Sequence, residues 1–162
     1  MSSFVVDTNV AVAANGAAEQ AGPACVLACV AALEAIRDAG KIVLDDRMLI
    51  LREYLGAVGL AARPGPGRAF VKWVFDNQGV SDRCERVPVE PIDDSFAQFP
   101  QDPTLAGFHR KDRVFVAVAL ASTSRPAVLN AVDSDWWDYR EALAAHGVRV
   151  QFVCPEQFAK RA

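Results

Sequence analysis

Short apolar runs alternate along the chain with longer segments in which hydrophobic residues recur at helical spacing. The first run, at 4–6, is brief and rich in valine, which is typical of a buried strand. Similar runs predict strands at 41–44, 86–90, 127–132 and 148–153. Helical spacing predicts helices at 10–14, 24–38, 47–60, 69–77, 108–121 and 136–145. Because parallel strands need crossover connections, this order favours an α/β fold around a mostly parallel sheet.

Two of the predicted helices carry an acid in an apolar setting. In the helix at 47–60 the main apolar stripe is Met48, Leu51, Leu55 and Val58, and Glu53 lies beside this stripe. The helix at 108–121 is apolar all round and therefore predicted to be buried, with Asp112 in its first turn. The stretch 93–107 between them is predicted to be a helical turn followed by a long surface loop.

Acids also follow two of the predicted strands. Asp7 comes directly after the first strand, and Asp133 and Asp135 follow the strand at 127–132. Carboxyl ends of parallel strands lie along one edge of a sheet, so these acids can share a crevice with Asp112 and Glu53. Carboxylates that close together repel one another, and a hard divalent ion, Mg²⁺ or Mn²⁺, would resolve the repulsion.

Three of these acids also have an ordinary structural explanation. Asp7 is equally suited to cap the helix that follows it. Glu53 could be a solvated edge residue, and Asp112 could be placed for the helix dipole alone. The recurrence of acids at the ends of apolar elements favours the shared site.

Composition limits the class of protein. The chain has 162 residues, of which 52% are hydrophobic, and this is suited to one compact domain over 1–162. We find no secretory signal pattern and no apolar stretch long enough for a membrane span, so we expect a soluble, cytoplasmic protein with no membrane partner. The net charge of −3 comes from 20 acids and 17 bases, and setting aside the five acids named above leaves a slightly basic remainder. A nucleic-acid substrate is therefore not excluded.

The four cysteines show no paired metal-ligand spacing. Cys25 and Cys29 lie one helical turn apart, while Cys84 and Cys154 stand alone. We predict that Cys25 and Cys29 are reduced core thiols, and neither zinc nor a disulfide is required to explain the cysteines.

Four short motifs, in this order, resemble the PIN-domain ribonucleases. That family has an early strand ending in Asp-Thr/Ser-Asn, a Glu on the helix after the second strand, an Asp opening a buried Ala-rich helix, and Asp or Asp-x-Asp after the next strand. The matching residues here are Asp7-Thr8-Asn9, Glu53, Asp112 and Asp133-Ser134-Asp135. The extra acids Asp45 and Asp46 and the long segment 64–107 depart from compact, toxin-type members.

The resemblance implies a fold, an activity and a set of site residues. It implies a three-layer α/β/α fold and a Mg²⁺- or Mn²⁺-dependent endoribonuclease that leaves a 5′-phosphate and a 3′-hydroxyl. Asp7, Asp112 and Asp133 would bind the metal, and Glu53 and Asp135 would complete the acidic pocket. The candidate substrate contacts are Thr8, Asn9, Arg110, Lys111 and Arg113, with Arg63 and Arg68 in addition. The implied partners are an RNA substrate, an antitoxin protein if this is the toxin of a toxin–antitoxin pair, and a second copy of the chain in a homodimer.

Two functions from other classes fit parts of the same pattern. One is a PIN-like module that binds RNA or protein without turnover. The other is a phosphoryl-transfer domain with an aspartyl nucleophile, as in haloacid-dehalogenase-like phosphatases or response-regulator receivers. The phosphatase pattern requires a second Asp two residues after the first, and this chain has Asn9 at that position. Trp136 and Trp137 could stack on a base, although core packing is the simpler interpretation.

Overall fold

A five-stranded, all-parallel sheet forms the centre of the molecule. The computed structural model describes residues 1–161, and its sheet has the order β3-β2-β1-β6-β7. The strands are β1 (Ser3–Val6), β2 (Lys41–Asp45), β3 (Cys84–Val87), β6 (Ala127–Asn130) and β7 (Val150–Phe152). β1 is the central strand, with Phe4 opposite Ile42 of β2 and Ala127 of β6. Neighbouring strands of the sheet are parallel because the connections between successive strands cross over through helices.

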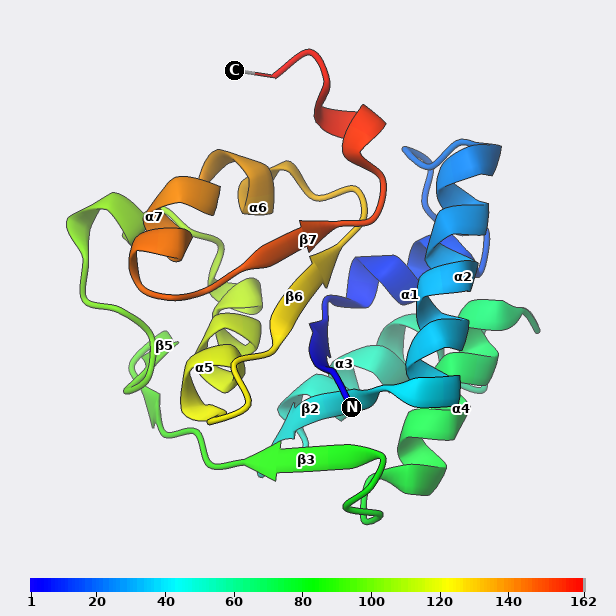
Figure 1. Ribbon diagram of the computed structural model, residues 1–162, viewed down its shortest axis with the longest axis horizontal. Helices are drawn as coiled ribbons and strands as arrows, with labels where there is room; N and C mark the ends of the chain where they lie inside the picture. The colour runs from blue at the N-terminus through cyan, green and yellow to red at the C-terminus, as the bar shows by residue number, and fades with distance from the viewer. Residues whose placement is uncertain (162) are drawn as a thin grey trace.

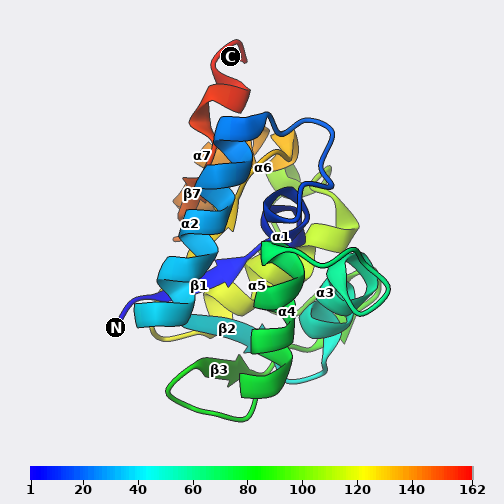
Figure 2. The ribbon, with the colours of Figure 1, turned by 90° about the vertical axis from the view of Figure 1, so that its right-hand side faces the viewer.

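Helices cover both faces of this sheet. α1 (Thr8–Ala14), α2 (Pro23–Ala39), α3 (Leu49–Val58) and α4 (Pro66–Asn77) connect the strands from β1 to β3. α5 (Arg113–Ala121) precedes β6, and α6 (Ser134–Asp138) and α7 (Arg140–Ala145) connect β6 to β7. Figure 1 shows α2 and α4 on one side of the sheet and α5 and α7 on the other, and Figure 2 shows α1, α2 and α4 together on the first side. The predicted α/β class, with a parallel sheet between helical layers, is confirmed.

Several element boundaries differ from the sequence prediction. β3 lies at Cys84–Val87, earlier than the predicted 86–90, because it pairs in register with β2 and Pro88 cannot donate to that ladder. The helix predicted at 136–145 is broken at Tyr139 into α6 and α7. The helix predicted at 108–121 is a 3₁₀ turn, η2 (Arg110–Asp112), followed by α5.

The helix predicted at 47–60 is shorter and buries a different set of residues. α3 begins at Leu49, because Met48 has a left-handed φ of 64° and the Asp45 carboxylate accepts the amides of Leu49 and Ile50. Its buried residues are Ile50, Leu51, Tyr54 and Val58. Leu55, which was predicted in the apolar stripe, is exposed.

The stretch between β3 and α5 is not a helical turn and loop throughout. It holds a short antiparallel hairpin of β4 (Pro91–Ile92) and β5 (Ser95–Phe96), and a 3₁₀ turn, η1 (Pro103–Leu105). No helix within residues 1–161 is both long and apolar enough to cross a membrane.

The prediction of a reduced thiol is wrong for Cys25, and so is the expectation that no disulfide is required. Cys25 on α2 and Cys154, which directly precedes the last 3₁₀ turn, η3 (Pro155–Phe158), form a disulfide. They are 129 positions apart in sequence, and their Cα atoms lie 5.3 Å apart. Tertiary packing of the C-terminal segment against α2 makes this pair, and such a long-range pairing has no local sequence signal. Cys29 and Cys84 are free and buried.

Gly67 sets how closely α4 approaches α1. A Cβ at Gly67 would lie 2.0 Å from the backbone oxygen of Ala11. We expect Gly67→Ala to destabilise the protein by about 1–3 kcal/mol, because the added Cβ overlaps the backbone of α1 and the two helices would have to move apart. Urea unfolding measures the change.

Gly56 provides the matched control within α3. A Cβ there meets no atom within 4 Å. Gly56→Ala should therefore be neutral or stabilise the protein by up to about 1 kcal/mol. Equal effects of the two substitutions would contradict the close approach of α4 to α1.

Candidate metal centre

The strand order reverses between β1 and β6, and the acidic residues lie at this point. The chain proceeds from β1 to β2 and β3 on one side, and then returns to β6 and β7 on the other. In open parallel sheets, a crevice forms outside the carboxyl ends of the two strands where the order reverses. Asp7 directly follows β1, Asp133 comes three residues after β6, and Asp112 ends η2 where α5 begins. One carboxylate oxygen from each of these three residues lies within 4.8 Å of the other two.

Asp7 is buried and held by three donors. Its side chain is 4% exposed. Oδ1 accepts the backbone amide of Asn9 at 2.9 Å and the Asn9 side-chain amide at 2.7 Å, while Oδ2 accepts the indole N–H of Trp136 at 2.7 Å. Burial, with a further contribution from the charge of Asp133, raises the pKa of Asp7 to about 6 despite these donors. Asp7 therefore both caps α1 and presents a carboxylate to the crevice.

Asp112 and Asp133 complete the cluster from two other elements. Burial, together with the neighbouring charges of Asp7 and Asp133, raises the pKa of Asp112 to about 9. A hydrogen bond to Asp133 holds the protonated form of Asp112. Asp133 itself is half-buried and caps α6 by accepting the amide of Asp135 at 2.9 Å.

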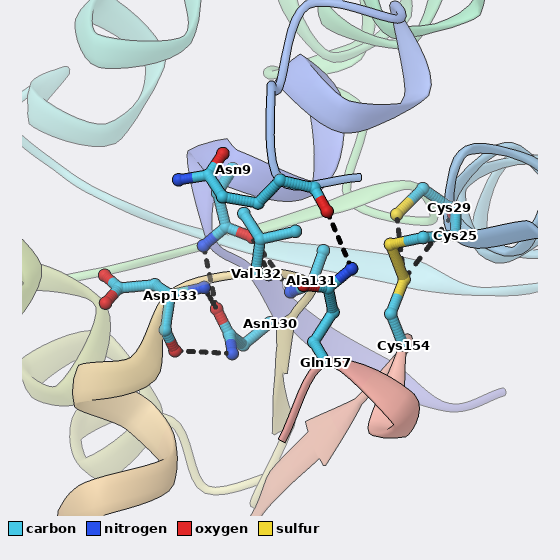
Figure 3. Close-up of a disulfide and its surroundings, with 10 residues drawn as sticks. Asn9, Cys25, Cys29, Asn130, Ala131, Val132, Asp133, Cys154 and Gln157 are labelled. Carbon is cyan, nitrogen blue, oxygen red and sulfur yellow. Dashed lines mark hydrogen bonds between the residues drawn. A yellow bond between two sulfur atoms is a disulfide. The ribbon is translucent and has the colours of Figure 1, made fainter. Parts of the chain in front are cut away.

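Asn9 connects the ends of β1 and β6, as Figure 3 shows. Its side-chain nitrogen donates to Asp7 and, at 2.8 Å, to Asn130 Oδ1. Its side-chain oxygen accepts the amides of Ala131 at 2.8 Å and Val132 at 3.2 Å. Both donors and both acceptor positions of the amide are thus used within the protein. Asn9 was predicted as a substrate contact. In the structure its side chain supports Asp7 instead, and a phosphate contact would require these bonds to break.

Glu53 and Asp135 lie at the margin of the cluster. Burial and the charge of Asp7 raise the pKa of Glu53 to about 7, while Thr8 and Lys111 lower it. Burial and the charge of Asp133 raise the pKa of Asp135, and His109 lowers it. The Thr8 hydroxyl is buried and has no partner in good hydrogen-bonding geometry. Thr8 therefore keeps donor capacity at the edge of the crevice.

The predicted basic contacts divide into free and engaged side chains. Lys111 is exposed and close enough to Glu53 to affect its pKa. Arg110 pairs with Asp94 at 3.0 Å, and Arg113 donates to the backbone oxygens of Phe108 and Ala106. Together with Phe108 and His109, these three basic residues line a surface pocket of about 460 Å³.

Arg63 and Arg68 have structural contacts. Arg63 donates to the backbone oxygen of Asn15 at 3.4 Å, and the Arg68 side chain donates to that of Ala62 at 3.2 Å. Arg63 thus holds the segment 63–68 to the end of α1, and the backbone amide of Arg68 also donates to the Asn15 side chain there.

Trp136 and Asn130 were not predicted as site residues. Trp136 is fully buried, so it cannot stack on an RNA base, and its indole N–H orients Asp7. Asn130, at the end of β6, accepts a hydrogen bond from the Asn9 side-chain amide and donates to the backbone oxygen of Asp133 at 3.0 Å. Asn130 could have been predicted as a site residue, because it is a polar residue at the end of an apolar strand. No local pattern around Trp136 indicates that its indole N–H donates to Asp7. Trp137 stacks on Phe158 and is a packing residue.

The donor set fits a hard divalent cation. All three residues of the cluster offer carboxylate oxygen, the ligand that Mg²⁺ and Mn²⁺ prefer. Within residues 1–161, no ion pair connects any of them to Lys, Arg or His. Without a cation the cluster can relieve its repulsion only by holding protons, as the raised pKa values of Asp7 and Asp112 indicate.

Comparisons with known proteins assign no family. No protein-family model, curated protein or solved structure matches the chain. A function therefore has to be inferred from the fold and from the geometry of the acidic cluster.

In the absence of metal, we predict that the protein loses stability as the pH rises from about 4 to about 9. The folded pKa of Asp112, about 9, lies above its ordinary value of 3.8, so the folded state binds more protons across this window. The contribution of the protonated Asp112 to the free energy of unfolding is complete below the pKa of Asp112 in the unfolded chain. It is lost as the pH rises through the pKa of Asp112 in the folded protein. Asp7 and Glu53 act with the same sign at lower pH. Thermal unfolding in EDTA at a series of pH values measures this trend.

The Asp112→Asn variant isolates the upper part of that trend. Asparagine does not titrate, so the slope between pH 7 and about 9 should flatten in the variant. An unchanged slope would show that Asp112 is not the group responsible.

Proposed function

We propose that the protein is a Mg²⁺- or Mn²⁺-dependent endoribonuclease of the PIN type. The observation that carries the proposal is the convergence of Asp7, Asp112 and Asp133, with ligand oxygens within 4.8 Å of one another, at the strand-order reversal. The order of the acidic motifs in the sequence supports the same assignment. So does the parallel sheet between helical layers.

In this proposal the three aspartates hold the cation at the end of β1. When bound, the cation stabilises charge on the scissile phosphate and makes a water molecule more acidic. Trp136 and Asn9 keep the Asp7 carboxylate in one orientation, so that it needs no rearrangement to bind. Asp133 is fixed in turn by its cap on α6.

The residues at the margin supply proton transfer and substrate contacts. Glu53, whose pKa is raised to about 7, exchanges a proton near neutral pH and would accept one from the attacking water. Lys111 is exposed, its charge lowers the pKa of Glu53, and it would bind a backbone phosphate. Asp135 adds negative charge beside His109, at the margin of the carboxylate cluster.

The products and the partners are what the resemblance to PIN-domain ribonucleases implies. Cleavage would leave a 5′-phosphate and a 3′-hydroxyl on single-stranded or structured RNA. We include in the proposal a toxin role with an antitoxin partner, a homodimer and a cytoplasmic location. A small DNA-binding protein encoded beside this gene would support the toxin role.

Cleavage of single-stranded RNA with Mg²⁺ or Mn²⁺ tests the activity. We expect Asp7→Asn and Asp112→Asn to reduce the cleavage rate by at least about 10³-fold, because each removes a ligand of the cation. Gel assays with end-labelled RNA measure the rate, and circular dichroism confirms that the variants fold.

The control for these variants is Asp82→Asn, which removes an exposed acid and should keep full activity. A fully active Asp7→Asn variant would overturn the assignment of Asp7. Absence of metal-dependent cleavage on every RNA tested would favour the binding module. Labelling of the chain by acetyl phosphate would favour the phosphoryl-transfer domain.

Cation binding itself is testable without any substrate. We predict that Mn²⁺ raises the melting temperature of the protein, and raises it more at pH 8 than at pH 6, because the ion must displace protons from Asp7 and Asp112. Scanning calorimetry with and without Mn²⁺ measures the shift. Asp112→Asn should lose most of it and Asp82→Asn should keep it, and a similar shift in both variants would place the ion elsewhere.

A further inference from the structure

Three cysteines come together where the C-terminal segment contacts α2. Cys25 and Cys29 are one turn apart on α2, and Cys154 precedes η3. All three are at most 2% exposed, and their sulfur atoms lie within 4.8 Å of one another. Cys154 is bonded to Cys25, and its sulfur is 3.9 Å from that of Cys29 (Figure 3). The third thiol is thus next to the disulfide and is not part of it.

The three residues of this cluster offer only sulfur atoms as metal ligands. The chain has only two histidines, and both are elsewhere: His109 lies beside Asp135, and His146 contacts Asp102 at 2.8 Å. Within residues 1–161, no fourth cysteine or histidine joins the group. A structural Zn²⁺ is almost always four-coordinate, whereas soft thiolate sites that lack a fourth ligand suit Cu⁺.

We propose that the reduced protein binds one Cu⁺ through Cys25, Cys29 and Cys154, and that the Cys25–Cys154 disulfide is the closed state of this site. Opening requires a dithiol reductant, which gives two electrons to the disulfide. The S–S bond breaks, Cys25 and Cys154 become thiols, and the reductant leaves as its own disulfide. Cu⁺ then displaces protons from the sulfur atoms that it binds.

The surroundings of the sulfurs are consistent with this sequence of events. Cys25 is in the first turn of the 17-residue α2, where the helix dipole favours a thiolate. Cys29 is fully buried beside the disulfide, with its sulfur 3.9 Å from that of Cys154. The site is independent of the carboxylate cluster, because soft sulfur and hard oxygen ligands select different ions.

Competition with a chromogenic Cu⁺ chelator tests the site. The full-length protein is reduced with dithiothreitol, desalted without oxygen and titrated with Cu⁺ in the presence of bathocuproine disulfonate. We expect one Cu⁺ per chain in the reduced protein and none in the oxidised protein, since the disulfide occupies two of the three ligands. Near-UV circular dichroism establishes that the reduced protein is folded.

Two cysteine variants serve as the matched pair. Cys29→Ser retains the disulfide in the oxidised form, and after reduction it should bind Cu⁺ at least about tenfold more weakly. Cys84→Ser, which changes the buried free thiol on β3, should bind Cu⁺ like the unmodified chain.

Several results would overturn the proposal. These are loss of the near-UV signal on reduction, no retention of Cu⁺ against the chelator, or equal binding by Cys29→Ser and the unmodified chain. Tight binding of Co²⁺ to the reduced chain with a tetrahedral absorption spectrum would also do so, because it would require a fourth ligand.

Discussion

The mutual repulsion of buried carboxylates is the constraint on which this structure depends. Asp7 and Asp112 are nearly inaccessible to water, and Asp133 lies beside both. Removing carboxylates from water and placing them together is unfavourable unless protons or cations accompany them. The cluster lies at the reversal of strand order, where the ends of two strands and the start of one helix are already close together. Stability and site chemistry are therefore coupled in this chain.

The polar residues around the cluster maintain its geometry. The amide of Asp7 donates to Leu129 on β6, and the amide of Val153 donates to Asn130, so the ends of three neighbouring strands are joined by backbone bonds. Asn9 adds side-chain bonds across the same edge, and Trp136 closes the far side of Asp7. Because these partners are themselves buried or in regular structure, the carboxylates are fixed by groups that have little freedom of their own.

The sequence predicted what depends on local pattern. Apolar runs that end in acids located β1 and β6, and the uniformly apolar segment after Asp112 located α5. Boundaries that are set by strand pairing or by backbone conformation differ from the predicted ones. β3 follows the register of β2, and α3 begins only after Met48, whose backbone is left-handed. The donor from Trp136 to Asp7 spans 129 positions, and so does the Cys25–Cys154 bond. Contacts at such separations arise only from the assembled fold, so no local window contains them.

The same disulfide gives the molecule a particular covalent topology. While the bond is intact, residues 25–154 form a closed ring that contains β2, β3, β6 and β7. Glu53, Asp112, Asp133 and Asp135 belong to this ring, whereas Asp7 is outside it on the N-terminal arm. β1 nevertheless lies between two strands of the ring, paired with β2 on one side and β6 on the other. The acidic cluster is thus completed when a free arm inserts into a cyclic frame, and a single cut within the ring would leave the frame in one covalent piece.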